Sequence, residues 1–209
     1  MTFKNNRKSV LNMLHLVTKQ APQIPEKSTT GVDEYALFKR IVEGDVLAFE
    51  AFYKHYYTRL FRFILRTTRQ HETIEELIQE TLLLVWEKPE RFNYTSKIST
   101  WVFGIAYQKS LKSISKTARR SHDVDVDELN EIICDPLANL AENTETQDWL
   151  NCALDCLSAD QRAVIELTFY HGLAYQDIAK ILDCPENTVK TRMFHARKKL
   201  QAFVEDQEN

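Results

Sequence analysis

The sequence predicts an all-α protein with two small helical domains joined by an acidic flexible linker, the C-terminal domain being a helix-turn-helix. Three observations support this prediction. Apolar residues recur at three- and four-residue spacings over several segments, as they do on one face of a helix. Four glycines and five prolines in 209 residues are too few for the turns of a β-rich fold. An acidic stretch with little apolar periodicity separates two helical parts.

The first domain is predicted over residues 31–120, after a basic N-terminal extension, residues 1–30, that ends in a stretch rich in Pro, Ser and Thr. A short helix is expected from Asp33, closing near Gly44. The next helix carries an apolar stripe at helical spacing. Its members are Phe49, Phe52, Tyr53, Tyr56, Leu60, Phe63 and Ile64.

Two more helices complete the first domain. Residues 71–88 begin with acids, as the helix dipole prefers, and Pro89 ends that helix. After a loop, residues 99–120 form a fourth helix. Its apolar stripe is Phe103, Tyr107, Leu111 and Ile114.

The acidic linker is predicted over residues 121–146, and the second domain over residues 147–209. In that domain Ser158 is expected to cap a helix, and Gly172 separates it from a helix of about eight residues. A tight turn and a longer helix follow, which is the pattern of a helix-turn-helix.

Charge is unevenly distributed along the chain. The formal net charge is −3, yet residues 121–148 hold nine acids and no Lys or Arg. Outside this segment 27 basic residues face 21 acidic ones. Segregation of this kind indicates a polyanionic partner for the basic parts.

The last helix is the most basic part of the chain. Pro185 suits its first position, and Val189, Met193, Ala196 and Leu200 form a seam to be buried. The opposite face can enter a major groove, with Arg192 on the flank towards phosphate. A solvated basic face is the alternative. The candidate duplex contacts are Lys190, Thr191, Arg192, Phe194, His195 and Lys198.

The fourth helix carries its basic side chains on one side, together with Trp101. These are Lys109, Lys112, Lys116 and Arg119. Such a surface suits a phosphate backbone with an unstacked base. Equally, Trp101 can be a core residue and the lysines a solvated face.

These motifs resemble the extracytoplasmic-function (ECF) group of bacterial RNA polymerase sigma factors over residues 33–120 and 147–203. "EELIQETLLLVWEKPERF" resembles the polymerase-binding segment, "STWVFGIAYQKSL" the promoter-melting helix, and "LDCLSADQRAVIELTFYHGLAYQDIAKILDCPENTVKTRMFHARKKL" the helix-turn-helix domain. The resemblance implies no cofactor. It implies as partners the clamp helices and flap of core polymerase, promoter DNA in duplex and single-stranded form, and an anti-sigma factor.

The resemblance also assigns roles. Region 2, residues 31–120, would bind polymerase and melt the −10 element, and region 4, residues 147–209, would read the −35 element. The linker would thread towards the RNA exit path. The expected polymerase contacts are Glu76, Gln79, Glu80 and Leu83. The expected −10 contacts are Asn93, Lys97, Trp101, Gln108, Lys109, Lys112 and Lys116.

Four positions depart from the family pattern. Ala174 stands where Ser or Thr usually opens the first helix of the helix-turn-helix, which costs about 1 kcal/mol of capping. His195 replaces a commoner Arg or Lys, Gln108 a frequent Asn, and Ile98 a frequent aromatic residue. The promoter sequence is therefore not carried over from the family.

Two other classes of protein are alternatives. A two-domain helix-turn-helix activator that binds duplex DNA only would explain the last helix but not the basic fourth helix. An enzyme is not expected, because no glycine-rich phosphate loop or catalytic set stands out. Cys152 and Cys156 could bind metal with a His, but small buried thiols are the preferred interpretation.

Location is predicted from the cysteines and the apolar runs. Four cysteines do not make a disulfide framework, and no apolar run approaches the roughly 20 residues of a membrane span. Asn12 and His15 interrupt a signal-like start. We therefore expect a cytoplasmic protein without membrane insertion.

Overall fold

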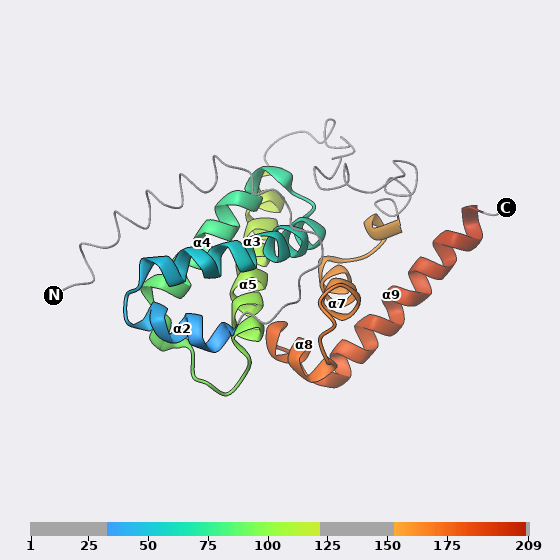
Figure 1. Ribbon diagram of the computed structural model, residues 1–209. Coiled ribbons are helices and arrows are strands. Elements are labelled where there is room, and N and C mark those ends of the chain that lie inside the picture. Colours follow the sequence, from blue (N-terminus) through green and yellow to red (C-terminus); the bar gives the residue numbers. More distant parts are fainter. Residues whose placement is uncertain (1–32, 122–152, 208–209) are drawn as a thin grey trace, which may run out of the picture.

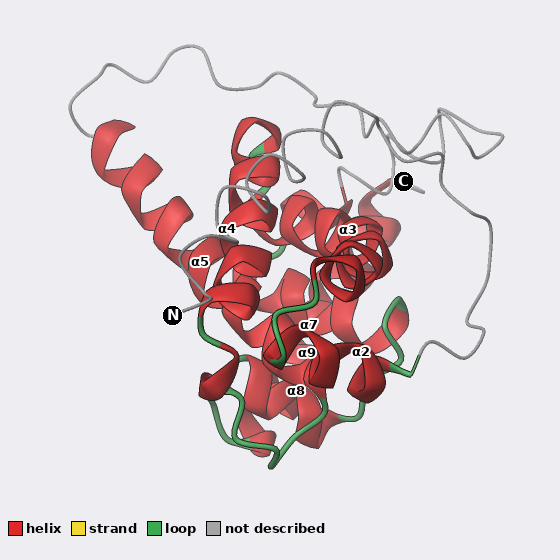
Figure 2. Ribbon diagram, turned by 60° about the vertical axis from the view of Figure 1, so that its left-hand side comes forward, coloured by secondary structure: helices red, strands yellow, loops and turns green. Residues whose placement is uncertain are grey.

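The computed structural model describes residues 33–121 and 153–207, and within them every regular element is a helix (Figure 2). The all-α prediction is therefore confirmed. The N-terminal extension (1–30), the acidic segment after residue 121 and Cys152 lie outside the described residues. We call residues 33–121 the N-terminal half and residues 153–207 the C-terminal half.

The first two helices begin where their caps are. Helix α2 spans Glu34–Val42, and the Asp33 carboxylate accepts hydrogen bonds from the backbone N–H groups of Tyr35 and Ala36. Gly44 follows at φ +84, a conformation that favours glycine. Asp45 caps α3, Val46–Thr68, in the same way. Every member of the stripe predicted for this helix is buried: Phe49, Phe52, Tyr53, Tyr56, Leu60, Phe63 and Ile64.

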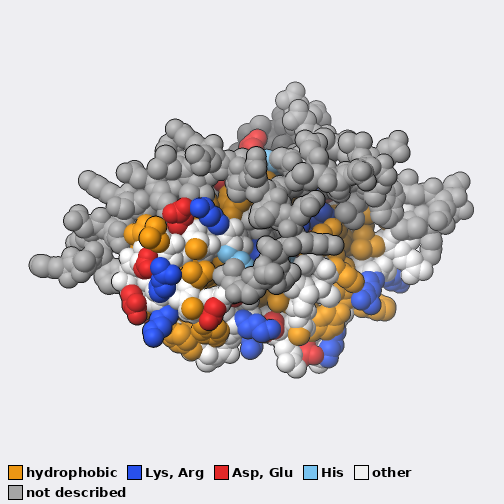
Figure 3. All heavy atoms as spheres, viewed as in Figure 1, with side chains coloured by type: hydrophobic (Ala, Val, Ile, Leu, Met, Phe, Trp, Pro, Cys, Tyr) orange, Lys and Arg blue, Asp and Glu red, His pale blue; other side chains and the backbone are white. Residues whose placement is uncertain are grey.

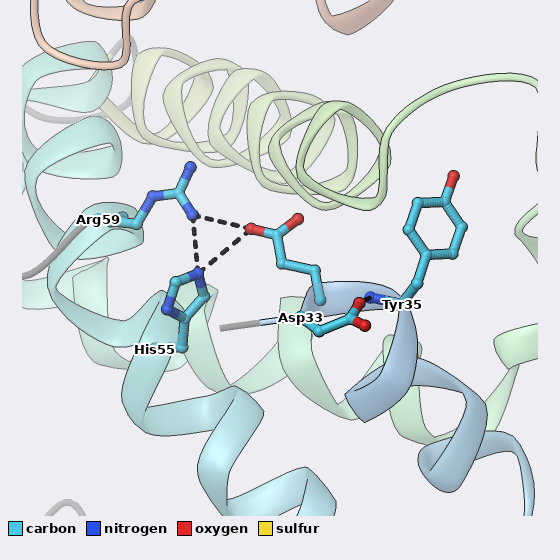
Figure 4. A network of polar contacts seen from close by, with 5 residues as sticks. Asp33, Tyr35, His55 and Arg59 are labelled. Atoms are coloured by element: carbon cyan, nitrogen blue, oxygen red, sulfur yellow. Dashed lines mark hydrogen bonds and ion pairs between the residues drawn. The ribbon is translucent and has the colours of Figure 1, made fainter. Parts of the chain in front are cut away.

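A polar network ties α2 to α3 (Figure 4). Glu34 Oε1 lies 3.2 Å from His55 Nε2 and accepts a hydrogen bond of 3.3 Å from Arg59 Nη1. Burial works to raise the pKa of Glu34, but the bonds from His55 and Tyr56 and the Arg59 charge lower it below its usual value. Arg59 also lies over the ring of Phe103, so one guanidinium joins three helices.

The rest of the N-terminal half follows the predicted order. A 3₁₀ turn, η1 (His71–Thr73), leads into α4 (Ile74–Glu87), and a second, η2 (Pro89–Arg91), follows it. Helix α4 thus ends two residues before Pro89. Helix α5 spans Ile98–Ser121 and buries Phe103 and Tyr107, while Leu111 and Ile114 are half-buried.

The C-terminal half contains the predicted helix-turn-helix. Ser158 and Gln161 form a capping box at the start of α7, Ala159–Phe169. Helix α8, Tyr175–Ile181, has no side-chain cap at Ala174, as predicted. Helix α9 spans Glu186–Gln207, so Pro185 precedes the helix by one residue instead of opening it. Val189, Met193 and Ala196 are buried along its seam, and Leu200 is half-buried.

The two halves pack together around a shared core. The prediction of two domains joined by a flexible linker did not include this contact. Figure 1 shows α7 and α8 beside α3 and α5, and α3 packs on α7 while α5 packs on α8. One buried cluster contains Phe63 and Phe103 from one half and Val164 and Ile178 from the other. At Gly104 an added Cβ would lie 3.9 Å from the backbone of Ile181, so α5 and α8 approach closely there.

Candidate nucleic-acid and polymerase interface

The predicted reading face of α9 is exposed. Lys190, Thr191, Phe194, His195 and Lys198 all reach solvent, and Phe194 is 64% exposed although its ring is fully apolar. Its ring meets that of His195 at 5.4 Å. The Lys190 ammonium pairs with Glu186 one turn earlier at 2.8 Å, an exposed contact within the same helix. This face can enter a groove without rearrangement.

Arg192 differs from the other predicted duplex contacts. Its guanidinium forms an ion pair with Asp160 at the start of α7, and one nitrogen lies 3.6 Å from the Cys184 sulfur. Only 25% of its side chain is exposed. The arginine predicted to hold DNA phosphate therefore holds a carboxylate in this structure.

The loop before α5 is ordered by its own polar groups. Asn93 Oδ1 accepts hydrogen bonds from the backbone N–H and hydroxyl of Thr95, which makes a tight turn. Tyr94 takes a positive φ of 59°, unusual for an aromatic residue, and is exposed. Lys97 reaches across to Asp177 of α8, with Nζ and Oδ2 3.4 Å apart.

Trp101 lies at the edge of an aromatic cluster. Its ring centroid is 5.4 Å from that of Phe92 and 5.8 Å from that of Phe38. The side chain is half-buried, so it packs against the core and keeps part of its surface open. Ile98 beside it is fully buried. The position is compatible with bracing a strand as well as with packing.

The basic side chains of α5 form two groups. Lys112 and Lys116 are exposed and line a groove of about 550 Å³ with Gln108 and Arg119. Lys109 is half-buried and bonds to Glu80 of α4 at 2.7 Å. Glu80 had been predicted as a polymerase contact, so the structure joins one residue from each predicted set.

The predicted polymerase contacts all lie on α4. Glu76 and Glu80 are exposed, and Gln79 and Leu83 are half-buried beside them. Figure 3 shows basic side chains next to acidic ones over the described part of the visible face, with no single-sign patch there. On α4 itself, two carboxylates, an amide and a leucine at helical spacing offer polar and apolar contacts to a protein partner.

Several ion pairs join the halves, with bases from the N-terminal half and acids from the C-terminal half. Besides Lys97–Asp177, Arg69 meets Asp155 at 2.8 Å and Arg66 meets the buried Glu166 at 3.4 Å. Sequence reasoning missed all of these acids, because an isolated Asp or Glu on a helix carries no signal of a distant partner.

Tyr107 and Asp160 were missed as a pair for the same reason. Tyr107 is 1% exposed, and its hydroxyl donates a hydrogen bond of 2.6 Å to Asp160. Burial, and then this bond, raise the pKa of Tyr107 above its usual value, so the hydroxyl remains a donor. The only sequence signal was a polar tip on a residue of the apolar stripe.

His171 is enclosed at the same contact. Its ring lies 4.5 Å from that of Phe103 and 6.5 Å from that of Phe63. Burial, assisted by the charges of Arg59 and Arg62, lowers the pKa of His171 to about 3. Glu166 lies 3.9 Å away but is already paired with Arg66, so the imidazole is neutral.

One cysteine expectation is wrong. Cys156 was expected to be a buried thiol, but it is exposed, and its thiol donates to the carbonyl oxygen of Ala153. No helix among residues 33–121 and 153–207 has the length and apolar character needed to cross a bilayer.

The helix-turn-helix and the basic face of α5 define a DNA-binding helical protein, and comparison with known proteins places it more closely. Residues 52–120 match the family description "Sigma-70 region 2" and residues 147–200 match "Sigma-70, region 4". The ECF RNA polymerase sigma-E factor of Haemophilus influenzae is 27% identical over 191 residues, covering 82% of this chain and 95% of that protein. The RNA polymerase sigma-H factor of Pseudomonas aeruginosa is 25% identical and covers 84% of this chain and 96% of that protein.

Solved structures agree. The sigma factor RpoE of Bartonella quintana, in complex with the anti-sigma factor NepR, matches with a TM-score of 0.63 and 30% identity, over 75% of this chain and 98% of that one. CnrH in complex with the cytosolic domain of CnrY shares the fold, with a TM-score of 0.59 at 19% identity over 82% and 96% of the two chains. The chain belongs to the RNA polymerase sigma-70 family, as a member of its ECF group.

Proposed function

We propose that this sigma factor directs core RNA polymerase to promoters by dividing two DNA contacts between its halves. Region 2, residues 31–120, melts the −10 element, and region 4, residues 147–209, reads the −35 element as duplex. Residues 121–146 connect them. The observation that supports this division most is that two separate helices, α5 and α9, each carry a basic face.

Polymerase binding is assigned to α4. Glu76 and Glu80 offer carboxylates, and Gln79 and Leu83 add an amide and an apolar surface on the same side. Such a mixed stripe suits the helices of a protein partner. The partners proposed are the clamp helices and flap of core polymerase.

Strand opening is assigned to the loop and to α5. Asn93 and Lys97 can bond the edge of a base removed from its stack, and Trp101 can brace it. The basic side chains of α5 bind the phosphates of the separated strand. The residues assigned are Asn93, Lys97, Trp101, Gln108, Lys109, Lys112 and Lys116.

Duplex reading is assigned to α9. Lys190 can reach guanine acceptors, and the exposed Phe194 can meet thymine methyl groups. Arg192 holds phosphate once it leaves Asp160. The residues assigned are Lys190, Thr191, Arg192, Phe194, His195 and Lys198.

Two further proposals complete the function. RpoE and CnrH are each described in complex with a second protein, NepR as an anti-sigma factor in the first case, and we propose an anti-sigma factor as a partner of this chain. The protein acts in the cytoplasm as an initiation factor and not as an enzyme, since its chemistry is recognition and strand separation.

In vitro transcription tests the function directly. The full chain is mixed with core enzyme and a pool of promoters randomised at both elements, and transcribed templates are sequenced. Enrichment at two separated elements, with permanganate-reactive thymines at the −10 element, is expected. If the chain binds duplex alone but adds no initiation to core enzyme, the proposal is wrong and the duplex-only activator describes the protein.

A further inference from the structure

Helix α2 has no task in the proposed function, and it lies before residue 52, where the match to sigma-70 region 2 begins. It nevertheless contacts the loop of residues 92–97, which we call the melting loop, and the start of α5. The buried ring of Phe38 lies 5.2 Å from that of Phe92 and 6.4 Å from that of Tyr94. Trp101 of α5 lies 5.8 Å from the same ring. One side chain of α2 therefore contacts aromatic rings before and after the polar part of the loop.

Tyr35, one turn before Phe38, adds a second contact. Its ring lies 6.3 Å from that of Phe92, and its hydroxyl donates a hydrogen bond of 3.4 Å to the backbone carbonyl oxygen of Ser96. Tyr35 thus contacts both ends of the melting loop. The side chain is 49% exposed, so its removal should cost the fold less than the removal of a fully buried aromatic residue.

The melting loop needs support because part of its backbone is strained. Tyr94 has a φ of +59°, in the left-handed region that residues with a bulky side chain rarely adopt. Strained backbone persists only where the surrounding structure holds it. Here Phe38 and Phe92 pack on the Tyr94 ring, and Asn93 accepts hydrogen bonds from Thr95. The loop conformation therefore depends on α2 as well as on the loop's own polar groups.

Helix α2 is itself fixed to α3. Glu34 contacts His55 and accepts a hydrogen bond from Arg59, and Asp33 caps the same first turn. Figure 4 shows the Tyr35 ring pointing away from His55 and Arg59. One turn of α2 is thus attached to α3 by Glu34 and to the melting loop by Tyr35, which supports the loop on a rigid element.

We propose that α2 positions the melting loop for strand opening and that Tyr35 is a positioning residue, which acts through the loop and not on DNA. By holding Phe92 and Ser96, it lets Asn93 and Trp101 meet an unstacked base without first ordering the loop. Order that exists before binding removes the cost of ordering from the affinity. This role rests on the proposed function, since the base in question is the one that the melting loop is proposed to hold.

Two variants separate the ring of Tyr35 from its hydroxyl. Tyr35→Phe keeps the ring against Phe92 and removes only the bond to Ser96, whereas Tyr35→Ala removes both contacts. Val42→Ala is the matched control. Val42 lies two turns later on the same face of α2, is 39% exposed and has no aromatic ring to pack on the loop. Neither position belongs to the proposed DNA or polymerase contacts.

The first measurement is the affinity of each holoenzyme for single-stranded −10 DNA, taken from a promoter that the wild-type holoenzyme transcribes. An abasic nucleotide is placed at each position in turn, and it weakens wild-type binding most where the unstacked base is lost. Tyr35→Ala should weaken binding to the intact strand by about two- to tenfold, and Tyr35→Phe by less. With the abasic nucleotide at that position all chains should bind alike, because the base that the loop holds is missing. Val42→Ala should match the wild-type chain on every strand.

The second measurement needs no DNA. In the free full chain, amide hydrogen exchange in the melting loop, at Thr95 for example, should be faster in Tyr35→Ala than in the wild-type chain or in Val42→Ala. Exchange in α4 should be the same in all three chains.

The proposed positioning role requires both changes. An equal loss of affinity on intact and abasic strands refutes it, and so does unchanged exchange in the melting loop. A lower melting temperature without these two changes would also refute it and make Tyr35 a packing residue only. If the wild-type holoenzyme initiates nowhere and binds no single strand, the proposed function fails, while exchange in the free chain still decides whether α2 orders the loop.

Discussion

The helices α5 and α9 both carry candidate DNA contacts, but the protein uses their surfaces differently. On α9 the reading face is open, and the partner of Lys190 is a neighbour on the same helix. On the α5 side, Lys97 and Lys109 are paired with acids of other elements, and Trp101 packs in a cluster. Duplex reading therefore needs little rearrangement, whereas strand opening needs contacts to be released.

The difference follows from how each helix is packed. Helix α9 packs on α7 and α8 and buries only a narrow seam, with Val189 and Met193 in the shared core and Ala196 against Leu154 and Leu157. Helix α5 packs on α3, α4 and α8, and Gly104 lets α8 approach closely. These neighbours cover the first half of α5, whereas Lys112 and Lys116 in its second half stay exposed.

The largest effect is expected at Trp101, on the more engaged side. Trp101→Ala removes an indole from the cluster with Phe38 and Phe92, and the free energy of unfolding should fall by about 3 kcal/mol. Thermal unfolding measures this. Trp101→Phe keeps a ring there and should lose less.

The same variant tests strand opening. If Trp101 also braces the −10 strand, a promoter with a pre-melted bubble should restore transcription to Trp101→Ala at a temperature where it is folded. An absence of rescue would leave Trp101 as a packing residue only.

Next in size is the loss of duplex recognition at α9. Lys190→Ala should relax discrimination at one base pair by about 1–3 kcal/mol. Arg192→Ala should weaken all sequences alike and flatten the salt dependence of binding. Binding to promoter and random duplexes over a salt series checks both. An equal, sequence-independent loss in the two variants would contradict α9 as the reader.

Acidification should open the contact that covers α5. The pKa of His171 is about 3 when the two halves are packed together and about 6.5 when they are apart and the ring is exposed. Between these pH values only the separated arrangement binds a proton. The packed arrangement of the halves therefore loses stability as the pH falls below 6.5, by about 1.4 kcal/mol at pH 5.5, and is unaffected above.

The charged groups facing His171 are Arg59, Arg62 and Arg66 of α3 and Glu166 of α7. The radius of gyration between pH 7.5 and 5.5 measures the effect, which His171→Phe should remove. If the variant expands with pH as the wild-type chain does, another group is responsible.

The smallest effect is expected at the Lys109–Glu80 pair. It is partly exposed, so Glu80→Ala should change the free energy of unfolding by less than about 1 kcal/mol. Core binding should weaken, and single-stranded DNA binding should strengthen as Lys109 is released. Glu76→Ala, an exposed acid on the same helix, should weaken core binding without the gain in strand binding. A gain in both variants would mean that net charge alone is responsible.

Sequence reasoning located the helices well because their signals are local. Ser158 caps a helix as predicted, the first helix begins next to Asp33, and the stripe from Phe49 to Ile64 is buried. Such features depend on neighbours within one or two turns, which spacing reveals. The missing cap at Ala174 was predicted from a departure from the family pattern and is confirmed.

The packing of the halves was not predictable in the same way. Tyr107 was placed in the core, yet nothing near it in sequence indicates Asp160, 53 residues away. Arg192 was expected to be free for phosphate. The expectation did not include Asp160, because this partner lies on another helix. Contacts between distant acids and bases depend on the tertiary arrangement, and one sequence contains no periodic signal for them.

The start of α8 has no side-chain cap, and it lies at the contact between the two halves. Helix α8 has seven residues, and without a side chain to bind its first N–H groups the first turn is expected to fray more often than the rest. That turn carries Asp177, the partner of Lys97. Amide hydrogen exchange should therefore be fastest in α8 among the helices at the contact, and separation of the two halves would begin there.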